Sequence, residues 1–187
     1  MFNIHLKIAD ESDLDQIYDI MRLSFPYQER RAKYDVKKLL KEREEVFLKI
    51  VDNSKIVGII AYRDFSKIRF FEYFAVHPDY KGRGIGSVAL KNFISDFLQS
   101  DNETLVLEVE KPIDEIARRR IAFYKSFDFR LNDYDYNQPN YHTAKPVPMF
   151  LMTYKKSLSF SEFNIIKNKL YDVVYTNQIK KLPNIYK

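Results

Sequence analysis

The chain of 187 residues contains no cysteine, and this absence excludes three kinds of chemistry together. Without a thiol there is no disulfide, no thiolate zinc site and no cysteine nucleophile. Long apolar runs are also missing, since no stretch approaches the ~20 apolar residues that cross a bilayer. The first residues, MFNIHLKIADESD, lack the apolar core of a secretory signal peptide. We therefore expect a cytoplasmic protein that does not contact a membrane.

Charge of one sign is not concentrated anywhere in the chain. The net charge of +5 arises from 31 basic and 26 acidic residues, and the basic runs at 30–31, 37–38 and 118–120 are far apart in the sequence. No nucleic-acid partner and no metal site are predicted from this composition. A mild positive field would still help to collect a polyanionic ligand. The length and the 45% apolar content fit one globular domain with an appendage.

Glycine is scarce, and its distribution is the most informative feature of the chain. Three of the four glycines occupy alternate positions in residues 81–87, KGRGIGS. They follow an aromatic, apolar stretch at residues 69–76 and a turn at His77-Pro78, and a helical pattern begins at their end. Glycine lets the backbone turn tightly and bring its N–H groups close to a ligand, and the start of a helix suits a phosphate. With the cations Lys81 and Arg83, this segment predicts a pyrophosphate cradle.

Three phosphate-binding patterns compete for this segment. A P-loop requires a lysine followed by Ser or Thr after the glycines, which is absent. A dinucleotide fingerprint requires a third glycine where Ser87 stands, and a parallel sheet where antiparallel strands are predicted. Residues 81–86 resemble the third pattern, [QR]-x-x-G-x-[GA], the acyl-CoA pyrophosphate loop of the GNAT superfamily of N-acetyltransferases. Lys81 stands where Gln or Arg is usual. A glycine-rich turn without a ligand is the alternative.

The order of predicted elements resembles the same superfamily over residues 1–156. Hydrophobic periodicity predicts strands at 4–8, 46–51, 55–63, 68–76, 104–110, 129–131 and 149–155, and helices between Ser12 and Pro26, between Asp35 and Lys41, over 84–99, and from Pro112 to Phe127. Asp35 is expected to cap the second helix. The resemblance implies the α/β (α+β) GNAT fold: a mixed, mostly antiparallel sheet of about seven strands flanked by helices.

Two regions lie outside this common plan. Residues 132–148, rich in Pro, Asn and Tyr, form a long connection without periodicity of its own, which is typical of a functional or disordered segment. Residues 157–187 begin with a capping box at Ser159 and continue as an amphipathic helix, followed by a tail that contains Pro183. We therefore predict a GNAT acetyltransferase domain at 1–156 and a C-terminal helical extension at 157–187. The extra helix either packs on the domain or forms a contact in a homodimer.

The resemblance implies acetyl-CoA as the cofactor and assigns it two groups of residues. The pantetheine arm is expected to bind the backbone at the end of the strand 68–76, as an additional strand would. The pyrophosphate is expected at the glycine segment and the first turn of its helix. The implied cofactor-binding residues are Phe74, Ala75, Val76, Lys81, Gly82, Arg83, Gly84, Ile85, Gly86 and Ser87.

A second signature, residues 121–129 (IAFYKSFDF), resembles the F-Y-x-x-x-G-F segment of the family. Tyr124 corresponds to the tyrosine near the CoA sulfur, and a protonated phenol can donate a proton to a departing thiolate. Asp128 stands where glycine is usual, and aspartate tolerates the left-handed conformation better than most residues. Ala117 stands where an asparagine often contacts the cofactor. Tyr124 is the predicted general acid, and an aromatic residue packed in the core is the alternative.

The general base is less clearly indicated. Glu72 lies in the strand 68–76, and simple alternation places it on the same face as Phe70, Phe74 and Val76. There it can accept an amine proton, unless a bulge, which the resemblance implies for this strand, reverses its direction. Glu108 is the alternative, as a base or as an anchor for the substrate amine. A third alternative is an enzyme with no dedicated base, because a fraction of the amine molecules is already neutral in solution.

These predictions combine into one function. We expect an N-acetyltransferase that transfers acetyl from acetyl-CoA directly to a primary amine, with Tyr124 and Glu72 as catalytic residues. The acceptor is expected to be a small molecule held by Glu108 and by Tyr141, since aromatic side chains can contact a cationic amine. The alternative is a non-catalytic module that binds acyl-CoA as a sensor or regulator.

Overall fold

The computed structural model describes residues 3–181, so the predicted tail with Pro183 lies outside the described residues. Two compact units make up this part of the chain, the first ending at Leu105 and the second beginning at Val106. In residues 3–181, no helix is long and apolar enough to cross a membrane. The prediction of a domain at 1–156 with an extension at 157–187 stays a prediction.

The first unit contains a four-stranded antiparallel sheet. Its strands are β1 (Ile4–Ile8), β2 (Val46–Asp52), β3 (Lys55–Phe65) and β4 (Ile68–Val76), and they lie in this order. β2 and β3 are joined by a turn at Asn53 and Ser54, which both have positive φ. Such a short turn fixes the register of a hairpin.

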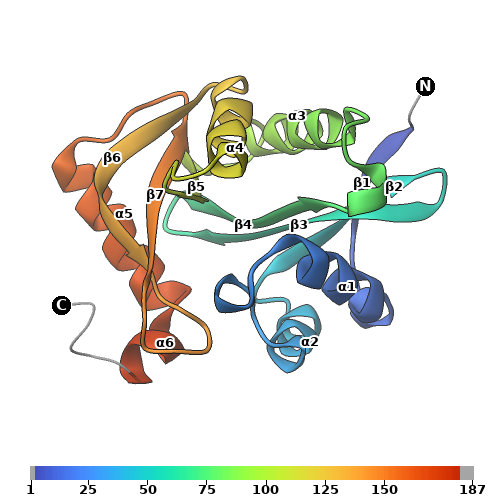
Figure 1. Cartoon of the computed structure of the whole chain (residues 1–187), viewed down its shortest axis with the longest axis horizontal. Helices are drawn as coiled ribbons and strands as arrows, with labels where there is room; N and C mark the ends of the chain where they lie inside the picture. Colours follow the sequence, from blue (N-terminus) through green and yellow to red (C-terminus); the bar gives the residue numbers. More distant parts are fainter. Residues whose placement is uncertain (1–2, 182–187) are drawn as a thin grey trace. The chain divides into compact units, whose positions relative to one another are not determined.

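Helices cover both faces of this sheet (Figure 1). α1 (Leu14–Ser24) and α2 (Lys33–Glu42) lie on one face, and α3 (Ile85–Phe97) lies on the other. On the first face, Met21 of α1 packs in one buried cluster with Tyr73 and Ala75 of β4. On the second face, the ring of Phe93 stacks on Phe71 at 4.6 Å between centroids. Both faces of β4 are therefore buried, which explains its nearly continuous apolar sequence.

The N-terminal caps of the first two helices differ from each other. Asp10 and Asp13 form a capping box around η1 (Glu11–Asp13), the 3-10 turn that leads into α1, with the Asp10 carboxylate accepting from Ser12 N at 2.8 Å, and Asp13 at the cap position of α1 makes no side-chain capping bond. The prediction that Asp35 caps the second helix is wrong, because α2 begins at Lys33 with Ala32 at the cap position. Asp35 lies in the first turn, where its negative charge still favours the helix dipole.

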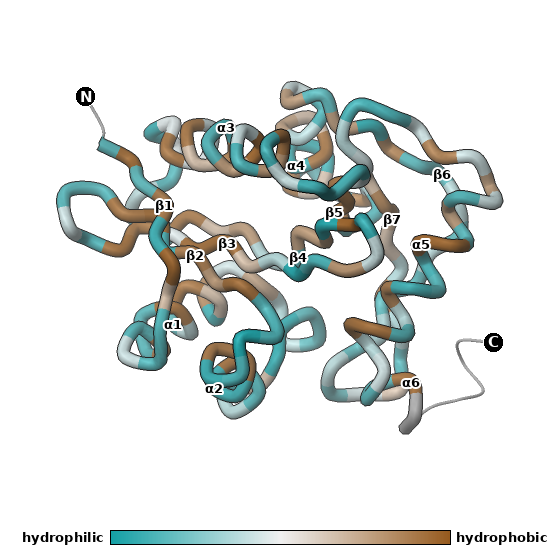
Figure 2. The backbone as a smooth tube through the Cα atoms, turned by 180° about the vertical axis from the view of Figure 1, so that it is seen from behind, coloured by the Kyte–Doolittle hydropathy of each residue, from teal (hydrophilic) through white to brown (hydrophobic). Residues whose placement is uncertain are grey.

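The second unit is built on three antiparallel strands and three helices. The strands are β5 (Thr104–Glu110), β6 (Phe129–Gln138) and β7 (Val147–Tyr154), in the order β5-β7-β6. α4 (Glu115–Lys125) precedes β6, and α5 (Phe160–Val173) and α6 (Thr176–Lys181) follow β7. Figure 2 shows α5 alternating between apolar and polar residues along its length. Its apolar residues Phe163, Ile166 and Leu170 are buried, as an amphipathic helix requires.

The fold class is confirmed, with seven mostly antiparallel strands and flanking helices. One strand was predicted far too short. The sequence indicated a strand at 129–131 and an irregular connection at 132–148, whereas β6 continues to Gln138 and leaves only 139–146 as the connection. The β6–β7 register is irregular between Asn132 and Tyr136, so simple alternation does not describe this strand.

Candidate functional site

The chain leaves β4 through a single-turn 3-10 helix, η3 (Pro78–Tyr80). His77 N donates to Val57 O at 2.9 Å, which fixes the end of β4 against β3. The His77 side chain accepts from Asp79 N at 3.3 Å and so caps η3, with Pro78 in its first turn. His77 thus has a structural role in the turn, as its position directly before Pro78 indicates.

Gly82 and Gly84 supply the backbone conformation on which the predicted cradle depends. Their φ angles are +75° and +79°, in the left-handed region that favours glycine. Both residues are exposed, and a Cβ built at either position meets no atom within 4 Å. The space over this loop is therefore open, and glycine is required by the backbone conformation rather than by crowding.

Gly84 is also the N-cap of α3, and it leads the chain into a helix with free donors at its start. No side chain caps this helix, and no acidic residue lies in its first turn. Its first intrahelical hydrogen bond runs from Val88 N to Gly84 O at 3.2 Å. The N–H groups of Ile85, Gly86 and Ser87 precede this ladder, so the positive end of α3 faces the open loop.

Gly86 has a different role from the other two glycines. It lies inside α3, and a Cβ built there would be 3.6 Å from Phe74 Cζ and from Val76 Cγ2, an ordinary contact distance. Gly86 therefore allows α3 to pack closely on β4. The fourth glycine, Gly58, lies opposite Val76, and a Cβ there would be 2.5 Å from Ala75 O. β3 therefore approaches the backbone of β4 closely at Gly58, whereas at Gly86 the neighbouring atoms belong to the Phe74 and Val76 side chains.

Two cations flank the glycines as the sequence indicated. Lys81 and Arg83 are both exposed. Arg83 Nη2 donates to Asp79 O at 2.8 Å, and its guanidinium lies 5.4 Å from the centroid of the Tyr80 ring. The Arg83 charge is thus held beside the loop instead of extending freely into solvent. The structure brings all of residues 81–87 together at one end of β4.

Glu72 does not lie on the predicted face of β4, and a β-bulge is the reason. Ala61 pairs with Tyr73 and Tyr62 pairs with Phe71, which leaves Glu72 as the extra residue. Phe71 and Phe74 consequently contact each other on the α3 side, with centroids 5.6 Å apart. The alternation that grouped Glu72 with Phe74 and Val76 was therefore wrong.

Glu72 instead forms a two-pronged ion pair with Arg31, in the connection that leads into α2. Arg31 Nε and Nη2 donate to its two carboxylate oxygens at 3.0 and 3.2 Å. The Glu72 side chain is only 1% exposed. An arginine that binds both oxygens of a carboxylate is a strong, oriented partner. Both oxygens of Glu72 are therefore already engaged.

The Arg31–Glu72 pair belongs to a buried charged cluster that also includes Glu45 and Arg63. Arg31 Nε and Arg63 Nη2 each lie 3.7 Å from Glu45 Oε2, and the Glu45 side chain is 0% exposed. Burial, with a further contribution from the Glu72 carboxylate, raises the pKa of Glu45 to about 8. At neutral pH Glu45 is thus mostly protonated.

Tyr124 lies in α4 with its ring buried. The ring contacts Phe129 edge-on, with centroids 5.6 Å apart, and Phe123 in a similar arrangement. Burial raises the pKa of Tyr124 well above its ordinary value, against a smaller opposing effect of Arg120. The phenol is therefore protonated throughout the neutral range. Asp128, after α4, has a φ of +66°, which accounts for glycine being usual at this position.

Glu108 of β5 is the centre of a hydrogen-bonded network in the second unit. Its carboxylate accepts from Gln138 Nε2 and from Tyr175 OH, each at 2.8 Å, and from Tyr136 OH. The ring of Tyr141 lies 5.7 Å from that of Tyr175. The structure thus brings Glu108 and Tyr141 into one neighbourhood. Gln138 and Tyr175 were not predicted, because one lay in a supposed irregular segment and the other beyond the amphipathic helix.

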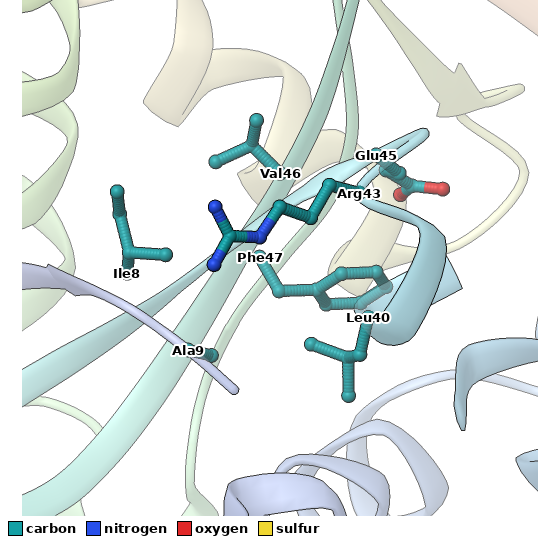
Figure 3. A pocket seen from close by; sticks show the side chains of 7 residues that line it. All are labelled: Ile8, Ala9, Leu40, Arg43, Glu45, Val46 and Phe47. Atoms are coloured by element: carbon teal, nitrogen blue, oxygen red, sulfur yellow. The ribbon is translucent and has the colours of Figure 1, made fainter. Parts of the chain in front are cut away.

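A separate hollow of about 180 Å³ lies in the first unit, between the end of α2, the end of β1 and the start of β2. Figure 3 shows Leu40 and Phe47 along one side, with Arg43 extending across them. The lining is mainly apolar and includes none of the residues predicted for the site. Across residues 3–181, no group of three or more His, Cys, Asp or Glu side chains is arranged to hold a metal ion.

Comparison with known proteins identifies the family to which these elements correspond. The model of the acetyltransferase (GNAT) family matches residues 14–129. A solved Bacteroides thetaiotaomicron structure, whose name assigns it to GNAT acetyltransferases, is 30% identical with a TM-score of 0.80, covering 91% of this chain and 98% of that one. The Escherichia coli ribosomal-protein-S18-alanine N-acetyltransferase shares the fold at 20% identity and a TM-score of 0.62, covering 83% and 96%.

A curated relative supports the same assignment from sequence. YjbC of Bacillus subtilis (strain 168), named as an acetyltransferase, is 30% identical over 116 residues. That match covers 60% of this chain and 56% of the relative, so the chain spans little more than half of its length.

Proposed function

The chain belongs to the acetyltransferase (GNAT) family, and from this premise we propose that it transfers an acetyl group from acetyl-CoA to a primary amine of a small molecule. The observation that carries the proposal is the loop between β4 and α3. It combines two glycines at positive φ, open space above them, an uncapped helix start and two cations. Such an arrangement suits a pyrophosphate.

The residues of this loop fit the cofactor that the family uses. In the proposal, the N–H groups from Gly82 to Ser87 hold the pyrophosphate, with Lys81 and Arg83 supplying charge. The backbone at Phe74, Ala75 and Val76, at the end of β4, holds the pantetheine arm. Acetyl-CoA, once bound, supplies the acetyl group as an activated thioester.

Groups of the chain itself then stabilise the negative charge that develops on the thioester oxygen and on the departing sulfur. A backbone N–H at the end of β4 donates to the thioester oxygen, where negative charge develops during acyl transfer. Tyr124 is proposed to donate a hydrogen bond to the departing sulfur. Because burial raises its pKa, Tyr124 releases its proton reluctantly, so its main contribution is a fixed donor that stabilises the thiolate.

Deprotonation of the amine is assigned to solvent rather than to Glu72. Arg31 binds both Glu72 oxygens in a buried ion pair, and accepting a proton would leave that arginine charge without its counterion. Glu72 thus orients the Arg31 connection beside β4. Glu108 and Tyr141 are proposed to contact the acceptor.

The test compares two glycines of the loop. Acetyl-CoA at ~100 times its dissociation constant should stabilise the wild type by about 2.7 kcal/mol, and this is measured as a thermal shift. Gly84→Val should remove the shift, because a β-branched residue does not adopt the φ of +79° on which the cradle depends and its side chain would occupy the open space above the loop. Gly86→Ala is the matched control and should bind normally, since its Cβ meets only ordinary contacts and alanine fits the family pattern.

The same samples are then tested for release of free CoA thiol with a panel of small primary amines. Amine-dependent release in the wild type and in Gly86→Ala, but not in Gly84→Val, supports transfer. No thermal response of the wild type to acetyl-CoA contradicts the proposal. A response without release for any amine favours the non-catalytic alternative.

A further inference from the structure

The Glu108 network in the second unit has a fixed direction of hydrogen bonding. Gln138 Nε2 donates to Glu108 Oε2 at 2.8 Å and to Tyr175 OH at 3.0 Å. Because Tyr175 OH accepts from the amide, its own hydrogen is directed to the carboxylate, 2.8 Å away. Tyr136 OH donates to the other oxygen of Glu108. The two hydroxyl hydrogens and one amide hydrogen therefore point toward Glu108, and the second amide hydrogen points toward Tyr175 OH.

This direction leaves one acceptor unused. The Gln138 amide cannot be turned over, because its oxygen would then face the carboxylate oxygen of Glu108. Gln138 is 5% exposed, yet its Oε1 has no hydrogen-bond partner among the described residues. A buried carbonyl oxygen beside a carboxylate is suited to a group that only donates hydrogen bonds.

An ammonium group meets this requirement. It has three donors and no acceptor, and its charge complements the carboxylate. The surrounding side chains are aromatic: Tyr136 and Tyr175 are buried, and Tyr141 lies against Tyr175. Aromatic rings stabilise a cation beside them. The surroundings of Glu108 therefore match an ammonium better than a neutral hydroxyl group.

We propose that Glu108, Gln138 and Tyr175 form a subsite for a second, non-reacting ammonium group of the acceptor, so that the preferred acceptors are diamines. This inference rests on the proposed function. The group held here is not the reacting amine, because acyl transfer requires a neutral nitrogen whereas a carboxylate favours the charged form. Tyr175 lies outside residues 14–129, the part that the family model matches, so the C-terminal segment would determine the acceptor preference.

The experiment compares two acceptors of equal length, putrescine and aminobutanol, which differ only in the distal group. The wild type should prefer putrescine in kcat/KM. Glu108→Gln should lower this preference by tenfold or more, and Tyr175→Phe by about tenfold, the lower end of the range for losing a hydrogen bond to a charged group. Both effects should lie in KM for putrescine, with kcat and the acetyl-CoA thermal shift retained.

Tyr171→Phe is the matched control. Tyr171 OH donates to Asn137 O at 2.6 Å, so this variant also loses a hydroxyl that joins the C-terminal region to β6, through a bond to a backbone oxygen instead of to the Glu108 carboxylate. Its putrescine preference should equal that of the wild type. An unchanged preference in both Glu108→Gln and Tyr175→Phe, or an equal loss in Tyr171→Phe, overturns the inference and makes the network a structural clamp.

A separate binding measurement distinguishes failure of this inference from failure of the proposed function. Putrescine alone should raise the thermal midpoint of the wild type and not of Glu108→Gln, whereas aminobutanol should raise neither. If amines are acetylated but putrescine gives no such shift and no preference, the inference is wrong and the proposed function stands. If the shift is present without any acetyl transfer, the subsite stands and the transferase proposal fails.

Discussion

Glu45, in the buried charged cluster of the first unit, binds and releases a proton near neutral pH in the folded protein, and replacing it by glutamine removes this titration. The unfolded chain releases this proton near pH 4.5, whereas burial and the neighbouring Glu72 raise the pKa of Glu45 in the folded protein to about 8. Between these two values the folded state holds a proton that the unfolded state has lost. The free energy of unfolding contributed by Glu45 is therefore fully present below pH 4.5 and is lost as the pH rises toward 8.

The size of the effect follows from the interval between the two pKa values. One proton changes the free energy of unfolding by up to about 1.4 kcal/mol for each pH unit within that interval, which amounts to a few kcal/mol in all. Glutamine has the shape of the protonated carboxyl and does not titrate. Glu45→Gln should therefore match the wild type near pH 5 and exceed its stability by a few kcal/mol at pH 9.

The assay is urea unfolding of both proteins at pH 5.5, 7 and 9, with midpoints and m-values compared. Glu162→Gln serves as a control with the opposite sign. The Ser159 N–H, with help from Lys156, lowers the pKa of the exposed Glu162 to about 2, so its contribution is present above pH 4.5 and disappears only in acid. Its effect should be constant from pH 5.5 to 9. Parallel curves for Glu45→Gln and the wild type over that range would refute the reasoning.

Three further predictions concern single contacts. Tyr124→Phe should lower acetyl transfer while leaving the acetyl-CoA thermal shift unchanged, because only the hydroxyl donor is lost; equal turnover in a stopped thiol-release assay would remove Tyr124 from the mechanism. Gly58→Ala should reduce the free energy of unfolding in urea by about 1–3 kcal/mol, since a Cβ 2.5 Å from Ala75 O forces the backbone apart. Asn132→Ala should reduce it by a similar ~1–3 kcal/mol, because Leu158 N at 2.7 Å and Thr153 Oγ1 at 3.0 Å lose a buried partner; an unchanged urea midpoint would contradict this.

The elements that were well predicted are those whose bounds are determined by residues close in sequence. β4 and β5 begin and end at the predicted residues, because each is a run of strong β-formers bounded by turn residues. The capping box at Ser159 starts α5 as predicted, since both of its hydrogen bonds lie within four residues. The glycine loop belongs to the same class, because its pattern and its backbone conformation are both local.

β6 was missed because its stability comes from other parts of the chain. Residues 132–138, NDYDYNQ, consist largely of turn formers. In the structure Asn132 fastens this stretch through Leu151 O and Leu158 N, and Gln138 fastens its end through Glu108. Each partner lies 19 or more residues away. No window of local propensity contains such partners, so a polar strand of this kind reads as a loop.

The direction of Glu72 shows the same limit within a strand that was otherwise predicted well. Alternation assigns faces only where the ladder is regular, and the β3–β4 bulge shifts every residue on its far side. A charged residue in the middle of an apolar strand nevertheless predicts a partner elsewhere in the chain. Its burial is tolerated only with a counterion, and Arg31, 41 residues away in sequence, provides it. The same reasoning applies to Glu108 in β5, whose carboxylate accepts from two tyrosine hydroxyls and an amide.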